Sequence, residues 1–237
     1  MKKLALILFG ISYHEDFNHY SNKNTIIDFR LSYDNYREYI YKYFNNLGYE
    51  IDVYFATNII DNEYIKNQLL DIYKPIKYIF MENNKDFHFS RNIKVKSAIE
   101  CVLESNIEYE ICLITRFDLL FQKNFNEHNI ILNSFNIISE LYNESLICDN
   151  FYLFPYNLLN KFYEIVNKNI KISFHKIKND IEKISNINYI LNEKTLGENL
   201  TFYKINRQYN GKNTIYVPVI KIINKKIIGL LKTKYKK

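Results

Sequence analysis

Two patterns of apolar residues alternate along the first half of the chain. Short, mostly apolar runs predict strands at residues 4–9, 51–57, 76–81 and 111–114, and the runs at 4–9 and 111–114 are unbroken. Apolar residues spaced by three and four predict helices between them, at residues 32–46, 63–73 and 90–103. An unbroken run is typical of a strand that is buried on both faces, as in a parallel sheet. The alternation therefore predicts an α/β fold with a doubly wound, mostly parallel central sheet and flanking helices.

Residues that begin or end elements support these boundaries. Gly48 is placed to end the first helix, and Pro75 cannot continue the second. Ser90 is a good N-cap for the third. The polar stretch 12–30 is longer than a simple strand–helix turn needs, which leaves two interpretations, a functional loop or a disordered one.

The pattern becomes less regular and more helical after residue 121. It predicts helices at 130–142, 158–166 and 198–203, a lysine-rich helical region at 168–192, and strands at 145–154 and 214–220. No linker or repeat divides the chain, and a length of 237 residues suits one α/β domain. We therefore expect a single domain over residues 1–237, with halves at 1–121 and 122–220 and a basic tail at 221–237.

The net charge of +6 lies in the C-terminal tail. Residues 221–237 hold seven lysines and no acidic residue, and subtracting these seven from +6 leaves −1 for the rest of the chain. No broad basic face is implied, so we expect no nucleic-acid partner. The apolar and basic segment 222–237 suits peripheral contact with an anionic membrane; a packed terminal helix with a solvated end is the alternative.

Composition adds little that is specific to function. The chain has 22 tyrosines, 17 phenylalanines and no tryptophan, which an AT-rich genome explains; a stacking surface for single-stranded nucleic acid is the alternative. Three cysteines without a CxxC spacing indicate reduced thiols rather than a zinc site. No apolar segment reaches the roughly 20 residues that span a bilayer, and no cleavage site follows the first apolar run. We therefore expect a cytoplasmic protein.

Two charged residues follow the most sharply bounded of the predicted strands. Arg116 and Asp118 come just after residues 111–114. An unpaired charge inside a protein costs several kcal/mol, so both side chains should lie at the carboxyl end of the strand, where open α/β sheets bind ligands. A structural ion pair is the alternative. The chain has no glycine-rich phosphate loop, HExxH or GxSxG, so strand-end side chains would have to hold any nucleotide.

The glycine exit of the first strand, three strand–helix units and the buried strand ending in Arg116-Phe117-Asp118 resemble the GT-A class of nucleotide-sugar glycosyltransferases. The pattern covers about residues 1–160. It looks most like small bacterial capsule or lipooligosaccharide enzymes and related enzymes of large DNA viruses. The strand commonly ends in Asp-x-Asp in that class and in Arg-x-Asp in some branches; this chain has no Asp-x-Asp. The resemblance implies hexosyl or deoxyhexosyl transfer, with residues 1–121 binding a nucleotide-sugar and 122–220 facing a glycan acceptor.

The resemblance also implies roles for single residues. Donor binding would fall to residues at strand ends, in the first loop and near the start of the third helix: Gly10, Ile11, Ser12, Arg30, Thr57, Glu82, Arg91, Arg116 and Asp118. Asp118 would hold Mn²⁺ or Mg²⁺ through its oxygens, with Asp149 or, more weakly, His175 as a second ligand. Arg116 would instead pair with phosphate through its guanidinium fork. Ordinary loop or solvated roles are the alternative for each.

An inverting transferase needs a carboxylate base for the acceptor hydroxyl. Asp149 is the first candidate, because it interrupts an apolar run on the acceptor side, and Glu198 is the second. A turn role for Asp149 and a partly buried structural role for His175 are the alternatives. Two other functions stay open. One is a sugar-nucleotide-binding or nucleotidyltransferase-like protein without glycosyl transfer, and the other is a single-stranded nucleic-acid binder.

Overall fold

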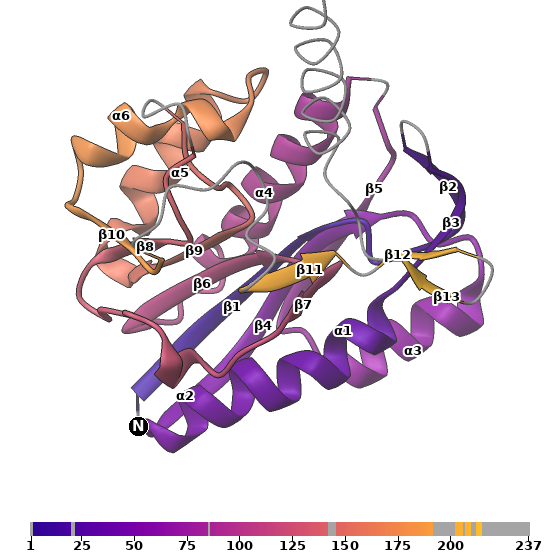
Figure 1. The fold of residues 1–237 in the computed structure, drawn as a ribbon, viewed down its shortest axis with the longest axis horizontal. Coiled ribbons are helices and arrows are strands. Elements are labelled where there is room, and N and C mark those ends of the chain that lie inside the picture. The colour runs from indigo at the N-terminus through magenta and orange to yellow at the C-terminus, as the bar shows by residue number, and fades with distance from the viewer. Residues whose placement is uncertain are drawn as a thin grey trace, which may run out of the picture.

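A seven-stranded sheet forms the centre of the molecule (Figure 1). The computed structural model describes residues 2–19, 22–84, 86–141, 146–191, 202–205, 207–209 and 212–214. The strand order is β10-β8-β9-β6-β1-β4-β5, and β9 runs antiparallel to the other six. The strands are β1 (Lys2–Gly10), β4 (Tyr49–Asn58), β5 (Lys77–Met81), β6 (Ile111–Arg116), β8 (Phe135–Ile137), β9 (Phe151–Pro155) and β10 (Ile187–Tyr189). The predicted α/β class and mostly parallel sheet are confirmed.

Helices cover both faces of this sheet (Figure 1). One face is covered by α1 (Phe29–Tyr36), a π-helical turn (Arg37–Tyr41), α2 (Lys42–Asn46) and α3 (Glu63–Tyr73). The other is covered by α4 (Phe87–Leu103), α5 (Leu159–Lys168) and α6 (Lys178–Glu182). Within the described part of the chain, no helix has the length and apolar character needed to cross a bilayer.

The unbroken apolar runs are explained by burial on both faces. In β1, Leu4, Leu6 and Leu8 pack into the core below α1 and α3, while the alternate residues pack against α4. The same division holds in β6, where Leu113 faces one cluster and Ile114 the other. Since neither face meets water, both sets of positions must be apolar.

Local signals fix most element ends in the first half. Asn62 caps α3 by accepting from the backbone N–H groups of Tyr64 and Ile65, and Lys74 ends that helix in a left-handed conformation ahead of Pro75. The predicted N-cap of the third helix is wrong by one turn. Asp86 caps α4 by accepting from Phe89 N, and Ser90 lies inside the helix, where its hydroxyl accepts from Asn84 N.

The polar stretch 12–30 is neither a long loop nor disordered over its described residues. It forms a hairpin, β2 (Tyr13–His19) and β3 (Asn22–Asp28), and α1 already begins at Phe29. Strand β3 also pairs with β12 (Arg207–Tyr209), and β12 pairs with β13 (Lys212–Thr214), both antiparallel. Sequence periodicity misses this sheet because its pairing partner lies near the other end of the chain.

The second half differs most from the prediction. The helix expected at 130–142 is absent from its described part, which follows a 3₁₀ turn (Phe125–Glu127) and contains β8. The apolar residues of this segment fit the spacing of a helix and that of a strand equally well. The buried Asn136 holds the preceding loop in place, because its side chain accepts from Ile131 N and donates to the carbonyl oxygens of Ile131 and Leu153. The strand expected at 145–154 begins only at Phe151.

The last elements also need correction. The helix expected at 158–166 is confirmed as α5, preceded by a 3₁₀ turn (Tyr156–Leu158). The lysine-rich region holds only a 3₁₀ turn (Phe174–Lys176), the short α6 and β10 in place of a long helix. Tyr203 opens β11 (Tyr203–Ile205), which pairs with β7 (Leu119–Phe121). Residues 192–201, with Glu198, and 215–237, with the basic tail, lie outside the described residues.

Candidate functional site

The carboxyl ends of four parallel strands lie side by side. Gly10 of β1 pairs with Thr57 of β4, and Phe9 pairs with Arg116 of β6. Because β9 runs antiparallel to β6, its first residue Phe151 lies opposite Thr115. The residues that precede β9, Asp149 and Asn150, therefore reach the same edge of the sheet.

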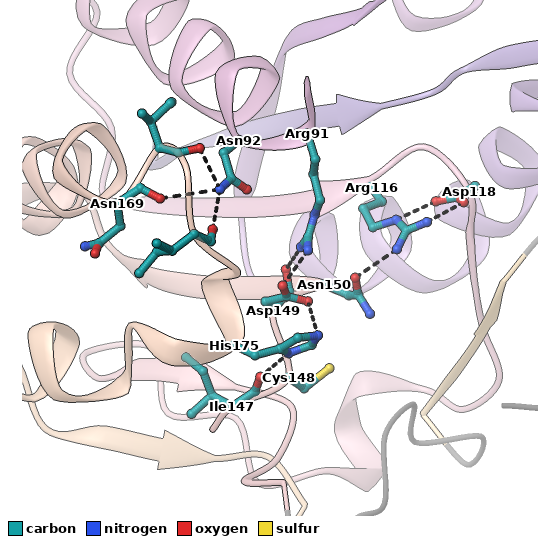
Figure 2. Close-up of polar contacts among 12 residues, drawn as sticks. Arg91, Asn92, Arg116, Asp118, Ile147, Cys148, Asp149, Asn150, Asn169 and His175 are labelled. Atoms are coloured by element: carbon teal, nitrogen blue, oxygen red, sulfur yellow. Dashed lines mark hydrogen bonds and ion pairs between the residues drawn. The ribbon is translucent and has the colours of Figure 1, made fainter. Parts of the chain in front are cut away.

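Arg116 and Asp118 form a two-pronged ion pair at this edge (Figure 2). Arg116 Nε donates to Asp118 Oδ1 at 2.7 Å, and Arg116 Nη2 donates to Oδ2 at 2.6 Å. Arg116 Nη1 donates to Asn150 Oδ1 at 3.0 Å. The side chains are 16% and 5% exposed, so the pair is largely shielded from water. Its two parallel charge-assisted bonds fix the orientation of the guanidinium.

A second buried ion pair lies beside the first and joins α4 to the start of β9. Arg91 Nη1 donates to Asp149 Oδ2, and Arg91 Nη2 donates to the Asp149 carbonyl oxygen at 2.6 Å. The Asp149 side chain is 1% exposed and that of Arg91 is 11% exposed. Burial raises the pKa of Asp149, but the nearby Arg91 and His175 outweigh it and hold the pKa below its ordinary value.

His175 contacts the same carboxylate from the opposite side. Its Nε2 lies 3.5 Å from Asp149 Oδ1, and its Nδ1 lies 2.6 Å from the carbonyl oxygen of Ile147 (Figure 2). A carbonyl oxygen only accepts, so Nδ1 carries a proton. The predicted residues Arg91, Asp149 and His175, distant in the sequence, are thus brought together.

A pocket of about 630 Å³ opens at the ends of β4 and β5. Its wall comes from the start of β2 and from the segments that follow β4 and β5, and includes Glu15, Asp61, Glu82 and Asn83. Of the predicted donor-binding residues, Glu82 lines this pocket. Gly10, at φ +99°, ends β1, the strand between β4 and β6. Apart from its chain neighbours, no atom lies within 4 Å of where its Cβ would be.

The structure gives other predicted residues structural contacts. Ser12 and Thr57 are buried, and Thr57 Oγ1 accepts from Ser12 N at 3.0 Å and donates to Ser12 Oγ at 2.8 Å. This bond ties the exit of β1 to the end of β4. Arg30 pairs with Asp28 beside α1 and does not line the pocket. Ile11 is partly buried at the exit of β1.

Sequence reasoning missed several residues that hold the site. Asn150 links Arg116 to the hydroxyl of Tyr203, which accepts from Asn150 Nδ2 at 2.7 Å. Tyr36 donates from its hydroxyl to the carbonyl oxygen of Arg116. No local pattern marks these side chains, because each acts on a partner far away in the sequence. A polar residue inside an apolar run, as at Asn150, was the one available signal.

The side chains at Asp118 do not fit a divalent cation well. Both Asp118 oxygens already accept from Arg116, and Asp149 is paired with Arg91 and His175. Magnesium and manganese need several oxygen ligands. Among the described residues, no three His, Cys, Asp or Glu side chains are grouped to hold a metal ion.

Three solved structures are similar in part to this chain. One is a glycosyltransferase involved in the glycosylation of the major capsid of PBCV-1, at 12% identity and a TM-score of 0.35, covering 69% of this chain and 65% of that chain. HddC from Yersinia pseudotuberculosis aligns at 11% identity and a TM-score of 0.35, over 74% and 84%. The glycosyltransferase GlyE of Streptococcus pneumoniae aligns at 7% identity and a TM-score of 0.35, over 84% and 46%.

These likenesses are distant. This chain spans less than two thirds of the PBCV-1 enzyme and less than half of GlyE. No protein-family model and no curated protein sequence matches it. The function therefore has to be argued from the site, since a shared fold does not fix an activity.

Proposed function

We propose that this protein transfers a glycosyl group from a nucleotide-sugar to a hydroxyl group of a glycan. The observation that carries the proposal is the arrangement of the sheet edge. A pocket lies at the ends of β4 and β5, and two arginine–carboxylate pairs lie near the end of β6 and the start of α4. Gly10 ends β1, the strand between β4 and β6, and no side chain stands there. Two strand spacings, about 10 Å, separate the ends of β4 and β6. That span suits a ligand with a base at one end and charged phosphates further along.

Each part of such a donor has a counterpart along this edge. The base and ribose would lie in the pocket, whose carboxylate and amide side chains offer hydrogen-bonding partners. The diphosphate would cross Gly10, where no side chain blocks it, and meet Arg116 and Arg91. The sugar would then lie beside Asn150 and Asp149. Arginine is well suited to this place because its planar fork matches phosphate oxygens.

The proposed reaction breaks one bond and forms another at the anomeric carbon of the donor sugar. The acceptor hydroxyl oxygen attacks this carbon, and the bond to the phosphate oxygen breaks, with its electron pair going to the nucleoside diphosphate. The hydroxyl proton goes to a base, for which Asp149 is the candidate. This role requires that Arg91 turn from Asp149 toward the donor phosphate, because the carboxylate is otherwise enclosed.

The test combines binding with turnover. Purified protein is offered a panel of UDP-, GDP- and dTDP-sugars, and release of nucleoside diphosphate is measured with and without glycan acceptors. We expect one nucleotide to bind and to be released from its sugar. Asp149→Asn should bind that nucleotide but lose at least about 100-fold in turnover, the usual contribution of a positioned base.

Asp71→Asn is the matched control, since Asp71 is exposed on α3 and lies on the other face of the sheet. It should leave binding and turnover unchanged. If no nucleotide-sugar binds, the proposal fails. Binding without turnover on any acceptor would favour the sugar-nucleotide-binding alternative.

A further inference from the structure

We propose that protein cations, and not a divalent metal, neutralise the donor diphosphate, with Arg91 and Arg116 as its ligands. This inference rests on the proposed function and specifies how its site would work. It starts from the poor fit between the carboxylates of the site and a metal ion. Asp118 then acts as a positioning residue that holds Arg116 at the sheet edge. Asp149 holds Arg91 in the same way until Arg91 turns to the donor and frees the carboxylate to act as the base.

The pairing of Asp118 with Arg116 opposes metal binding at this carboxylate. Both of its oxygens accept from Arg116, at 2.7 and 2.6 Å, while the side chain is 5% exposed. A metal ion at this carboxylate would have to break two charge-assisted hydrogen bonds. It would also leave a second cation, the largely buried guanidinium, close to itself. Removing one partner from a buried ion pair is strongly unfavourable, so the pair opposes metal binding.

The pairing of Asp149 with Arg91 opposes metal binding at the second carboxylate of the site. Arg91 binds both the carboxylate and the carbonyl oxygen of this residue, and His175 lies against the remaining carboxylate oxygen. Each acid of the site is thus paired with one arginine, Asp118 with Arg116 at the end of β6 and Asp149 with Arg91 of α4. Arg91 and His175 orient Asp149, and Arg91 occupies both the Oδ2 atom and the carbonyl oxygen of this residue.

Lys94 adds a buried positive charge one turn after Arg91. This lysine is 2% exposed and lies in α4. Its Nζ donates to Asn83 Oδ1 at 2.9 Å and to the Ser90 carbonyl and hydroxyl oxygens at 3.2 Å each, and all three acceptors are neutral. Asn83 also lines the pocket, so the ammonium lies one hydrogen bond behind its wall.

The charges at the two ion pairs favour an anion. Arg91, Lys94 and Arg116 supply three positive charges against the two carboxylates of Asp118 and Asp149, whereas the carboxylates of Glu15, Asp61 and Glu82 line the pocket where the base and ribose would lie. As the bond to the anomeric carbon breaks, negative charge grows on the leaving phosphate oxygens. Guanidinium forks held in place beforehand stabilise that charge without a metal ion.

The test measures binding, so it does not depend on finding the acceptor. Uridine diphosphate, guanosine diphosphate and deoxythymidine diphosphate are titrated calorimetrically into the full chain, once in EDTA and once with Mn²⁺. We expect the Kd of the nucleotide that binds most tightly to agree within about threefold between the two conditions, because no metal contributes. Arg116→Ala should weaken binding by about tenfold or more in both, the cost of losing a charged hydrogen bond.

Two conservative variants separate positioning from metal ligation. Arg116→Lys keeps the charge but loses the fork, and should weaken binding in both conditions. Asp118→Asn removes one clamp on Arg116 and should weaken binding equally with and without Mn²⁺. Arg37→Ala, an exposed arginine in the π-helical turn, is the control and should change nothing. Thermal melting confirms that each variant is folded.

The outcomes distinguish the two proposals. Binding that appears only with Mn²⁺ and disappears in Asp118→Asn overturns the present inference and leaves the proposed function standing. A failure of all three nucleotides to bind under either condition overturns the proposed function, and the inference with it. Equal binding in EDTA and Mn²⁺, sensitive to Arg116→Lys, supports both.

Discussion

At the scale of single residues, Lys94 is the least expected feature of the molecule. It is buried with three neutral oxygen acceptors in the first half of α4. Burial lowers its pKa to about 8 from the ordinary value of 10.5. Such a charge costs stability, which is easier to understand if it serves an anionic ligand.

This burial predicts a dependence of stability on pH. Below pH 8 both states of the chain hold the Lys94 proton, and the cost of burying the charge is present in full. Between about pH 8 and 10.5 the unfolded chain binds more protons than the folded one, so the free energy of unfolding rises with pH. Lys94→Met lacks this term. The free energy of unfolding of the wild type, relative to that of Lys94→Met, should therefore increase by on the order of 1–2 kcal/mol between pH 7.5 and pH 9.5.

Urea unfolding of both proteins across this range measures the difference. Tyrosine titration affects both equally and cancels. Lys161→Met, at an exposed position of α5, should show no such trend. A pH-independent difference between wild type and Lys94→Met would show that Lys94 stays protonated throughout.

At the scale of elements, Gly48 sets where the first helical segment stops. It follows α2 at φ +82°, and its N–H donates to Asn45 O at 2.9 Å. No atom lies within 4 Å of where a Cβ would be, so a substitution meets backbone strain and no clash. The left-handed region is costly for most residues and cheaper for asparagine.

Gly48→Ala should therefore lower the free energy of unfolding by about 1 kcal/mol, with Gly48→Asn closer to the wild type. Denaturant melts of the three proteins measure this order. Equal stability of the alanine variant and the wild type would mean that the turn relaxes out of the left-handed region. Donor binding should be unaffected, because Gly48 lies at the amino-terminal end of β4, opposite the site.

At the scale of the whole molecule, one sheet joins the two halves of the chain. Strand β9, from the second half, pairs with β6 of the first, and both hydrophobic clusters contain residues from either side of residue 121. We therefore expect a single calorimetric transition, with equal calorimetric and van't Hoff enthalpies. Two separate transitions, or a stable proteolytic fragment ending near residue 121, would contradict this.

The sequence alone determined most strands and helices of the first half of the fold, apart from the hairpin β2–β3. Helix α3 matches its predicted bounds, and the strand at 111–114 is buried on both faces as expected. These features depend on period, caps and glycines within a few residues of one another, which is information that the chain carries locally. The same reasoning placed Arg116 and Asp118 at the end of that strand.

Tertiary structure alone decided which of those charges are paired. The hairpin β2–β3, the insertion of β9 beside β6, and the pairing of Arg91 with Asp149 all join segments distant in the sequence. Hydrogen-bond register and buried charge pairing depend on which segments meet in space, and no local period encodes that. Two arginines and two carboxylates could be read from the sequence as a metal site or as a phosphate site. Only their pairing, each acid with its own arginine, favours the second.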